Sequence, residues 1–151
     1  MSPWEGEVMN TLYLIARIAD ETIALPAEQI GSVVEVEDIA PIPRVPPHVA
    51  GLFALRSRVL TVIDTRAALN LGSIARAGAM TAVIVESEGH SYALLVDMVE
   101  DVIEAAAPEP CPALLGAAWR RAARGTIRRD EQAILLVDPA VLVAGPDALA
   151  A

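Results

Sequence analysis

The chain has 151 residues, of which 54% are hydrophobic and only 3% aromatic, and it carries a formal net charge of −9. This length fits a single domain, and its core must be aliphatic. Because an acidic chain lacks the basic face that neutralises phosphate groups, the charge argues against nucleic acid and against an anionic membrane surface as partners.

The cysteine count and the N-terminus bear on the location of the protein. Cys111 is the only cysteine, so no disulfide can form within the chain, which fits a reducing compartment. No apolar run approaches the roughly 18 residues that span a bilayer. Residues 1–10 contain Glu5 and Glu7 and no basic side chain, unlike a secretory signal. We therefore expect a cytoplasmic protein without direct membrane insertion.

Most of the chain is predicted to be β-strand. Turn residues interrupt short apolar runs about every 8–12 residues, which is typical of a β barrel or sandwich. Proline-rich stretches at residues 38–47 and 104–112 are predicted to be loops. Strands are expected at residues 12–18, 23–25 and 32–37, in the run that ends at residue 55, and at residues 59–63, 81–86, 92–96, 99–104, 125–129 and 133–138.

Apolar and acidic residues alternate within the strand at residues 32–37. Val34 and Val36 are expected on one face, and Glu35 and Glu37 on the other, because successive side chains of a strand point to opposite faces. The valines suit either the core or the wall of an apolar groove. The glutamates suit either solvent or the acidic side of an interface.

A charged turn follows the proline-rich loop and an apolar strand. The strand stops at Leu55, the turn Arg56-Ser57-Arg58 follows, and a second apolar strand begins at Val59. Cations held rigidly at an exposed hairpin tip suit contact with another protein better than they suit bond-making chemistry. The alternative interpretation is that both arginines are solvated surface charges.

Helical structure is predicted at four places. Residues 27–30 and 139–143 suit single helical turns, and residues 65–71 suit a short helix. The strongest helical pattern covers residues 113–124, where apolar residues recur at helical spacing after Pro112. Its basic residues suit either contact with an acidic partner or a solvated face; they are Arg120, Arg121 and Arg124.

Residues that carry chemistry are few and scattered. Asp64, Asp97 and Asp138 each follow an apolar strand, where an aspartate commonly caps the next turn. Hydrolysis would need two of them facing across a cleft, and Cys111 would need a histidine partner for covalent catalysis. The two histidines and one cysteine fall short of a metal site. We expect no cofactor, and a small β-barrel hydrolase or ligand-binding protein using these residues is the alternative function.

Residues 46–66 read Pro-Pro-His-Val-Ala-Gly-Leu-Phe-Ala-Leu-Arg-Ser-Arg-Val-Leu-Thr-Val-Ile-Asp-Thr-Arg. This segment resembles the CheW-like family of coupling proteins in bacterial chemosensory arrays, which typically has Gly-Val-Asn-Leu-Arg-Gly and then Pro-Val-Ile-Asp-Leu-Arg. Weaker matches follow the family order at residues 13–15, 23–26, 93–102 and 125–138. Three residues depart from the family pattern: Ala54 stands at the usual Asn, and Ser57 and Glu131 stand at usual turn glycines.

The resemblance implies a mainly all-β fold of two five-stranded SH3-like β barrels packed on a shared aliphatic core, with short helices. It places one CheW-like domain at residues 12–143, between tails at residues 1–11 and 144–151. It implies no catalysis. The expected function is that of an adaptor that couples the signalling tip of a methyl-accepting chemoreceptor to the regulatory domain of a CheA-type histidine kinase.

The resemblance also suggests binding residues. Arg56 matches the arginine of the family's Leu-Arg-Gly turn, which is linked there to receptor contact. An apolar groove between the barrels would accept a receptor helix, since such grooves need aliphatic walls and a polar rim. The candidate receptor- and kinase-binding residues are Arg56, Arg58, Val34, Val36, Glu35, Glu37, Leu52 and Val99.

Overall fold

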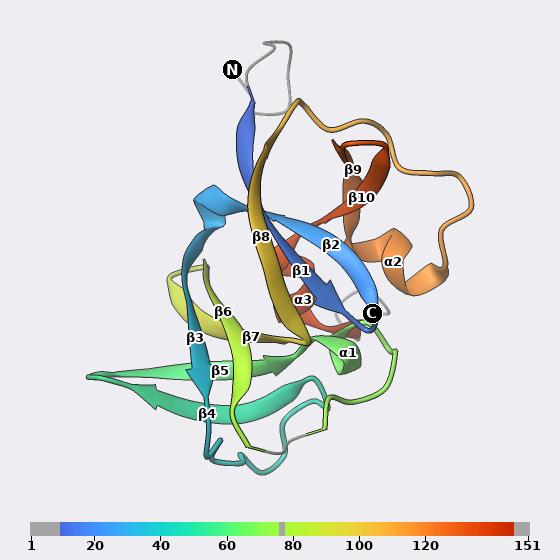
Figure 1. The fold of residues 1–151 in the computed structure, drawn as a ribbon. Helices are drawn as coiled ribbons and strands as arrows, with labels where there is room; N and C mark the ends of the chain where they lie inside the picture. Colours follow the sequence, from blue (N-terminus) through green and yellow to red (C-terminus); the bar gives the residue numbers. More distant parts are fainter. Residues whose placement is uncertain (1–9, 76–77, 147–151) are drawn as a thin grey trace.

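The computed structural model describes residues 10–75 and 78–146. In this part of the chain, ten strands form two five-stranded sheets connected by four short helices (Figure 1). Sheet A has the order β8-β1-β2-β10-β9, with β1 (Thr11–Ile18), β2 (Glu21–Pro26), β8 (Met98–Ala105), β9 (Ala123–Arg129) and β10 (Gln132–Val137). Sheet B has the order β3-β6-β7-β5-β4, with β3 (Ile30–Val36), β4 (Val49–Leu55), β5 (Arg58–Asp64), β6 (Met80–Ser87) and β7 (His90–Val96). The helices are η1 (Ala27–Gln29), α1 (Thr65–Ala68), α2 (Ala117–Ala122) and α3 (Pro139–Ala144).

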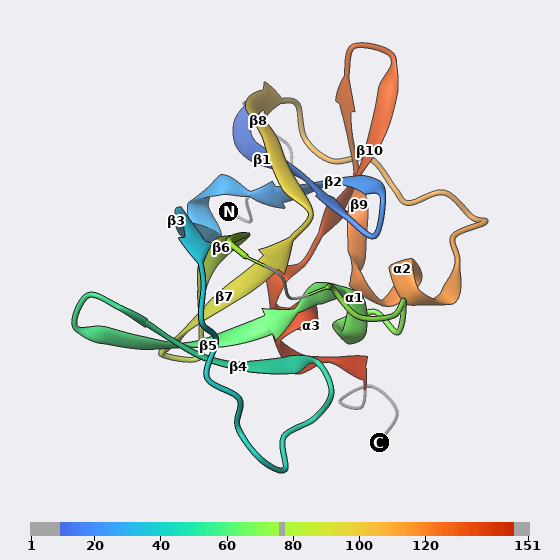
Figure 2. The ribbon, with the colours of Figure 1, turned by 60° about the horizontal axis from the view of Figure 1, so that its bottom comes forward.

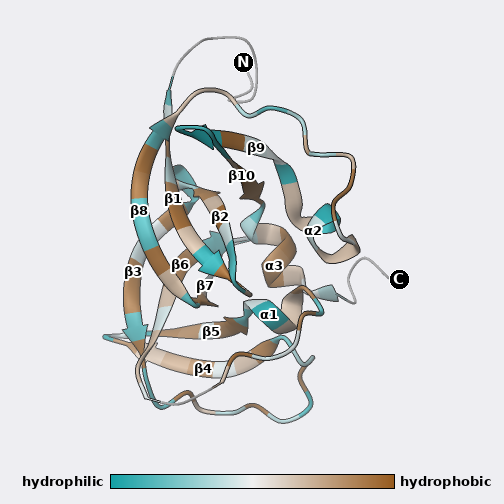
Figure 3. Cartoon of the chain, turned by 45° about the vertical axis from the view of Figure 1, so that its right-hand side comes forward, coloured by the Kyte–Doolittle hydropathy of each residue, from teal (hydrophilic) through white to brown (hydrophobic). Residues whose placement is uncertain are grey.

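Two strands cross from one sheet to the other. β3 follows the β1–β2 hairpin of sheet A but pairs with β6 of sheet B, whereas β8 follows the β6–β7 hairpin of sheet B but pairs with β1 of sheet A. Each crossing strand is the outer strand of the sheet that it joins. Figure 3 shows β8 above β3 along the same margin of the molecule. The exchange ties the two sheets into one unit.

The core consists of three clusters of buried side chains. The largest lies between the sheets and takes Leu14 and Ile23 from sheet A and Val83 and Leu94 from sheet B. A second cluster lies under sheet B and a third under sheet A. Nearly all members are Val, Ile, Leu or Ala, so the predicted aliphatic core is confirmed. The predicted two five-stranded units are also confirmed, although neither sheet closes into a complete barrel.

The helix predicted at residues 113–124 is much shorter in the structure. Gly116 precedes α2, and the chain already enters β9 at Ala123. The reason is backbone hydrogen bonding outside the helix. Glu109 exchanges two hydrogen bonds with Thr126, both 2.8 Å long, and these hold the preceding loop in extended form beside β9. Ladder hydrogen bonds and burial thus override local helix propensity.

The chain ends partly depart from the predicted tails. Thr11 belongs to β1, Ala144 to α3, and Gly145 is buried against the His48 ring. Residues 1–9 and 147–151 of the predicted tails lie outside the described residues. No helix in the described ranges combines the length and the apolar character needed to cross a bilayer.

Candidate docking surfaces

The β4–β5 hairpin carries the predicted arginines at its tip, residues 55–58. Leu55 pairs with Arg58, so Arg56 and Ser57 alone form the turn. The positive φ falls on Arg56, at 58°, and not on Ser57. The serine at the family's usual glycine position therefore needs no left-handed backbone. Figure 2 shows this hairpin projecting from the body of the molecule.

The two arginines of the tip differ in their surroundings. Arg58 begins β5, and its guanidinium donates a hydrogen bond to the hydroxyl of Ser91 in β7. Arg56 is exposed, and within the described residues it makes no side-chain hydrogen bond or ion pair. Val59, the next residue of β5, is 64% exposed. The tip therefore presents one uncommitted cation beside an aliphatic side chain.

Strand β3 places the predicted valines on the inner face of sheet B. Val36 is fully buried and Val34 is half-buried, and both pack into the cluster under this sheet. Val36 is therefore part of the core of sheet B, which is the alternative that the sequence analysis set beside a groove wall. Glu35 and Glu37 are exposed, as expected for the polar face.

Leu52 and Val99, the other two predicted groove residues, lie on different sheets. Leu52 is half-buried in β4, where its backbone exchanges hydrogen bonds of 2.9 and 2.8 Å with Ala40. Val99 is half-buried in β8 and packs against the core between the sheets. The aliphatic residues expected to form one groove are thus divided between two sheets, and only Val99 borders the core between them.

Exposed and half-buried aliphatic side chains on β1, β3 and β8 border the core between the sheets, and of these the sequence analysis singled out only Val99. Val33 is opposite Val83 and Val102 is opposite Leu14, and both partners belong to the core between the sheets. Residues opposite each other in a ladder share a face. Val33 and Val102 remain 43% and 53% exposed. We name this set of side chains the crossover face; it consists of Leu12, Val33, Val99 and Val102.

The crossover face has acidic neighbours. Glu35 shares the outer face of β3 with Val33, and Glu104 lies opposite Leu12 on the same side of sheet A. Both glutamates are exposed. An apolar strip with carboxylates beside it suits an amphipathic partner that carries cations next to its apolar side chains.

Leu114 is a second surface residue missed by the sequence analysis. It is 97% exposed, on the loop between β8 and α2. The helical pattern had assigned it to a packed helix face. Leu114 is therefore a surface residue and takes no part in the core.

The arginines around α2 are mostly occupied by contacts within the chain. Arg120 donates to the Leu115 carbonyl at 3.0 Å, and Arg121 donates to the Ala68 carbonyl at 3.4 Å. Arg124 forms an ion pair of 3.2 Å with the carboxylate of Asp138. These contacts favour a structural role for the three arginines over the binding of an acidic partner.

The three strand-end aspartates have structural partners and are not gathered into a cleft. Asp64 accepts from the backbone N–H groups of Ala67 and Ile74, at 3.1 and 3.0 Å. Asp97 pairs with Arg66 at 3.3 Å. Asp138 accepts from the N–H of Ala140 at 2.9 Å and so caps α3.

The cysteine and histidines likewise form no reactive group. Cys111 is half-buried in the loop before α2, whereas the buried His48 ring donates from Nε2 to the Val143 carbonyl at 3.0 Å. His90 is exposed at the β6–β7 turn. Over residues 10–75 and 78–146, no three His, Cys, Asp or Glu side chains come together as metal ligands.

Two packed β sheets that expose a cationic tip and an aliphatic strip define a protein-docking domain. The family model described as "CheW-like domain" matches residues 12–146, and the chain therefore belongs to the CheW-like family. The members of this family are non-catalytic scaffold and adaptor proteins, as the sequence analysis expected for this chain.

The solved structures include a close match in fold. The crystal structure of the scaffolding protein TtCheW from Thermoanaerobacter tengcongensis superposes with a TM-score of 0.72 at 25% sequence identity. The match covers 86% of this chain and 90% of that one. A comparison with curated protein sequences gives no significant match.

Proposed function

We propose that this protein is a cytoplasmic coupling protein that joins chemoreceptor signalling tips to the regulatory domain of a CheA-type histidine kinase. The family membership over residues 12–146 carries the proposal, together with the likeness to a scaffolding protein. The domain contributes docking surfaces, and the reaction itself belongs to the kinase. Its task is to hold two partners in a fixed arrangement.

The separation of the exposed surfaces supports this proposal. The hairpin tip projects from sheet B, whereas the crossover face follows the outer strands where the two sheets meet. One small domain can then bind two partners at once, because the surfaces do not overlap. We assign the crossover face to the receptor, since an aliphatic strip suits the apolar side of a helix.

The assignment of the hairpin tip rests on Arg56. Its charge has no partner in the described part of the chain, and the strands on either side limit its movement. A hairpin whose backbone is already ordered adds little backbone entropy cost on binding, and the exposed guanidinium stays accessible to a partner. Arg56 therefore suits a carboxylate at the junction of this protein with the receptor or the kinase, and Arg58 has a smaller role because Ser91 already holds it.

Binding measurements with both partners test the proposal. The purified protein should bind a receptor signalling-tip fragment and a kinase regulatory domain, each at micromolar concentration or tighter. Arg56→Ala should weaken one of these interactions about fivefold or more and leave the other unchanged. Arg128→Ala is the matched control, because it removes the same charge from a side chain that is 61% exposed on sheet A.

Two results would count against the proposal at different levels. No binding of either partner at high micromolar concentration would refute the coupling function. Normal binding by Arg56→Ala would leave the function standing and refute the role of the hairpin tip.

A further inference from the structure

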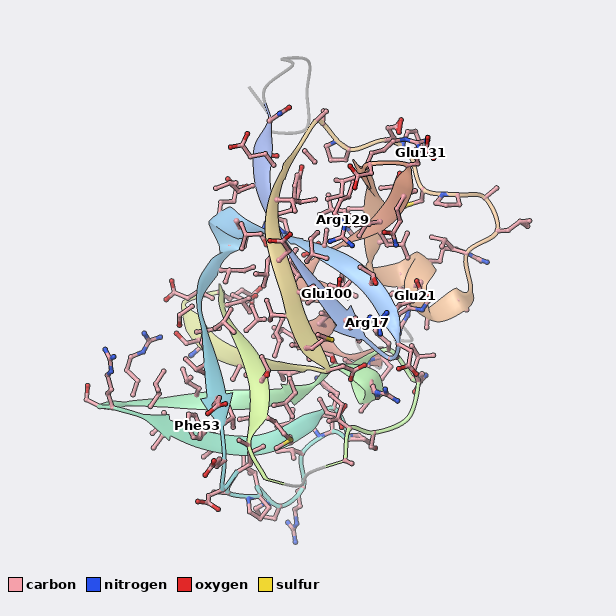
Figure 4. The ribbon with its side chains drawn as sticks, viewed as in Figure 1. Arg17, Glu21, Phe53, Glu100, Arg129 and Glu131 are labelled. Carbon is pink, nitrogen blue, oxygen red and sulfur yellow. The ribbon has the colours of Figure 1, made fainter. Side chains whose placement is uncertain are left out.

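The two outer strands of sheet A are joined by an ion pair and not by a ladder. β8 and β9 stand at opposite ends of the strand order, yet the curvature of the sheet brings them into contact. Where β8 and β9 meet, Glu100 Oε1 of β8 lies 3.6 Å from Arg129 Nη2 of β9. Figure 4 shows Arg129 and Glu100 along the same side of the sheet, with Arg17 below them.

Arg17 of β1 holds the same carboxylate from the other side. Its Nε lies 3.0 Å from Glu100 Oε2, so each carboxylate oxygen has its own arginine. The backbone of Arg17 also accepts a 2.8 Å hydrogen bond from the N–H of Asp97, just before β8 begins. The start of β8 is therefore attached to β1 through both main chain and side chain.

Glu100 occupies a special place in β8. Ile15 pairs with Asp101 and Ala16 pairs with Val99, so Glu100 is the extra residue of a β-bulge. Such a bulge shifts the alternation of side chains by one position. As a result, Val99 and Val102, three residues apart, lie on the same face of sheet A. Without the bulge, one of these two valines would point to the opposite face.

Two of the three charged side chains are mostly shielded from water. Glu100 and Arg129 are only 23% and 28% exposed, whereas Arg17 is 47% exposed. A carboxylate that is largely removed from water needs partners to compensate for lost solvation. Two guanidinium groups supply them, and they also fix the side-chain direction of the bulged residue.

We propose that Arg17, Glu100 and Arg129 act as a positioning cluster that fixes the bulge in β8 and thereby sets the crossover face. This inference rests on the proposed function, because it assigns the receptor helix to that face. Val99 and Val102 make the contact, and Glu100 acts through them. The cluster belongs to sheet A and the hairpin tip to sheet B, so we expect the affinity for the kinase regulatory domain not to depend on the cluster.

The variant Glu100→Gln tests the inference, since it removes the charge and keeps the size of the side chain. Receptor-tip affinity should fall about three- to tenfold, while the affinity for the kinase regulatory domain stays unchanged. Amide hydrogen exchange in residues 99–104 should become faster, which reports loosening of β8 itself. Arg129→Gln should reproduce both effects, and Arg129→Lys should largely restore wild-type behaviour.

Glu109→Gln is the matched control. It breaks a comparable ion pair on the same sheet, between Glu109 and Arg128 at 3.3 Å, but these side chains are 52% and 61% exposed and lie outside the bulge. This variant should leave both affinities and the exchange in β8 unchanged.

The outcomes separate the inference from the proposed function. Failure of the wild-type protein to bind the receptor tip would refute the proposed function. If the wild type binds and Glu100→Gln binds equally well, the positioning role is refuted alone. A parallel loss of both affinities would show that the cluster only stabilises the fold, and this result also overturns the inference.

Discussion

Gly51 in β4 and Gly125 in β9 occupy equivalent positions in the two sheets. Their φ angles are 148° and 150°, and each precedes a residue that exchanges two backbone hydrogen bonds with an extended loop. A Cβ at Gly51 would overlap the Ala40 carbonyl oxygen, and one at Gly125 would lie 2.6 Å from the Glu109 carbonyl oxygen. Both positions therefore require glycine for backbone conformation and for space.

Replacing either glycine should destabilise the protein strongly. We expect Gly51→Ala and Gly125→Ala each to lower the free energy of unfolding by about 2–4 kcal/mol, because strain and steric overlap add. Urea unfolding measures this loss. Gly116→Ala is the control and should change stability by less than about 0.5 kcal/mol, since its Cβ would meet nothing within 4 Å. A wild-type midpoint for Gly51→Ala would contradict the argument.

The equivalence extends to the strands that pair with these glycines. β5 ends in Asp64 and β10 is followed by Asp138, and each aspartate caps the short helix that comes next. The backbone N–H groups of these aspartates donate to the carbonyls of His48 and Ala122, at 2.8 and 2.9 Å. The Asp that recurs at strand ends in the sequence thus reflects two related halves of the fold.

The two caps should differ in energetic weight despite their equivalence. Asp64 is fully buried and accepts from two backbone N–H groups, so Asp64→Ala would leave buried donors unsatisfied and cost about 2–4 kcal/mol. Asp138→Ala should cost only about 1 kcal/mol, as is usual for an accessible N-cap. Chemical denaturation of the two variants checks the order. Equal losses would contradict the role assigned to burial.

Val33 and Val36 in β3 should separate binding from stability. Val33→Ser should weaken binding of the receptor tip and change stability by less than about 0.5 kcal/mol, because this side chain is 43% exposed. Val36→Ala should cost about 1–3 kcal/mol of stability and leave the affinity of the folded protein unchanged. Thermal unfolding and binding isotherms measure both quantities. Receptor binding lost in Val36→Ala at a temperature where it is fully folded would reverse this assignment.

The sequence predicts the strands well because period-two alternation reports burial directly. It also predicts the hairpin tip, since two apolar strands on either side of a short charged turn place Arg56 in the turn. It does not predict which face of β3 packs into the cluster under sheet B and which faces the core between the sheets. Both faces of that strand contain valine, and the answer depends on pairing with β6, which is distant in sequence.

The bulge at Glu100 is hidden from the sequence for a related reason. Strict alternation assigns Val99 and Val102 to opposite faces, and only the register with β1 reveals the extra residue. The sequence also does not predict that α2 is short. Its helical pattern extends beyond the helix on both sides, into a loop that backbone hydrogen bonds hold beside β9 and into β9 itself. Where a segment's structure depends on partners remote in the chain, local periodicity misplaces its side chains.

Leu114 should behave as a contact residue and not as part of the core. Leu114→Ser should leave the free energy of unfolding within about 0.5 kcal/mol of wild type, because the side chain is 97% exposed and has almost no packing to lose. It should weaken binding of the receptor tip or of the kinase regulatory domain about fivefold or more, because a partner that covers this side chain removes apolar surface from water. Titration calorimetry with each partner measures this effect. Leu71→Ser, at a position 39% exposed after α1, is the control for loss of a surface leucine. Unchanged affinity for both partners in Leu114→Ser would show that this loop takes no part in docking.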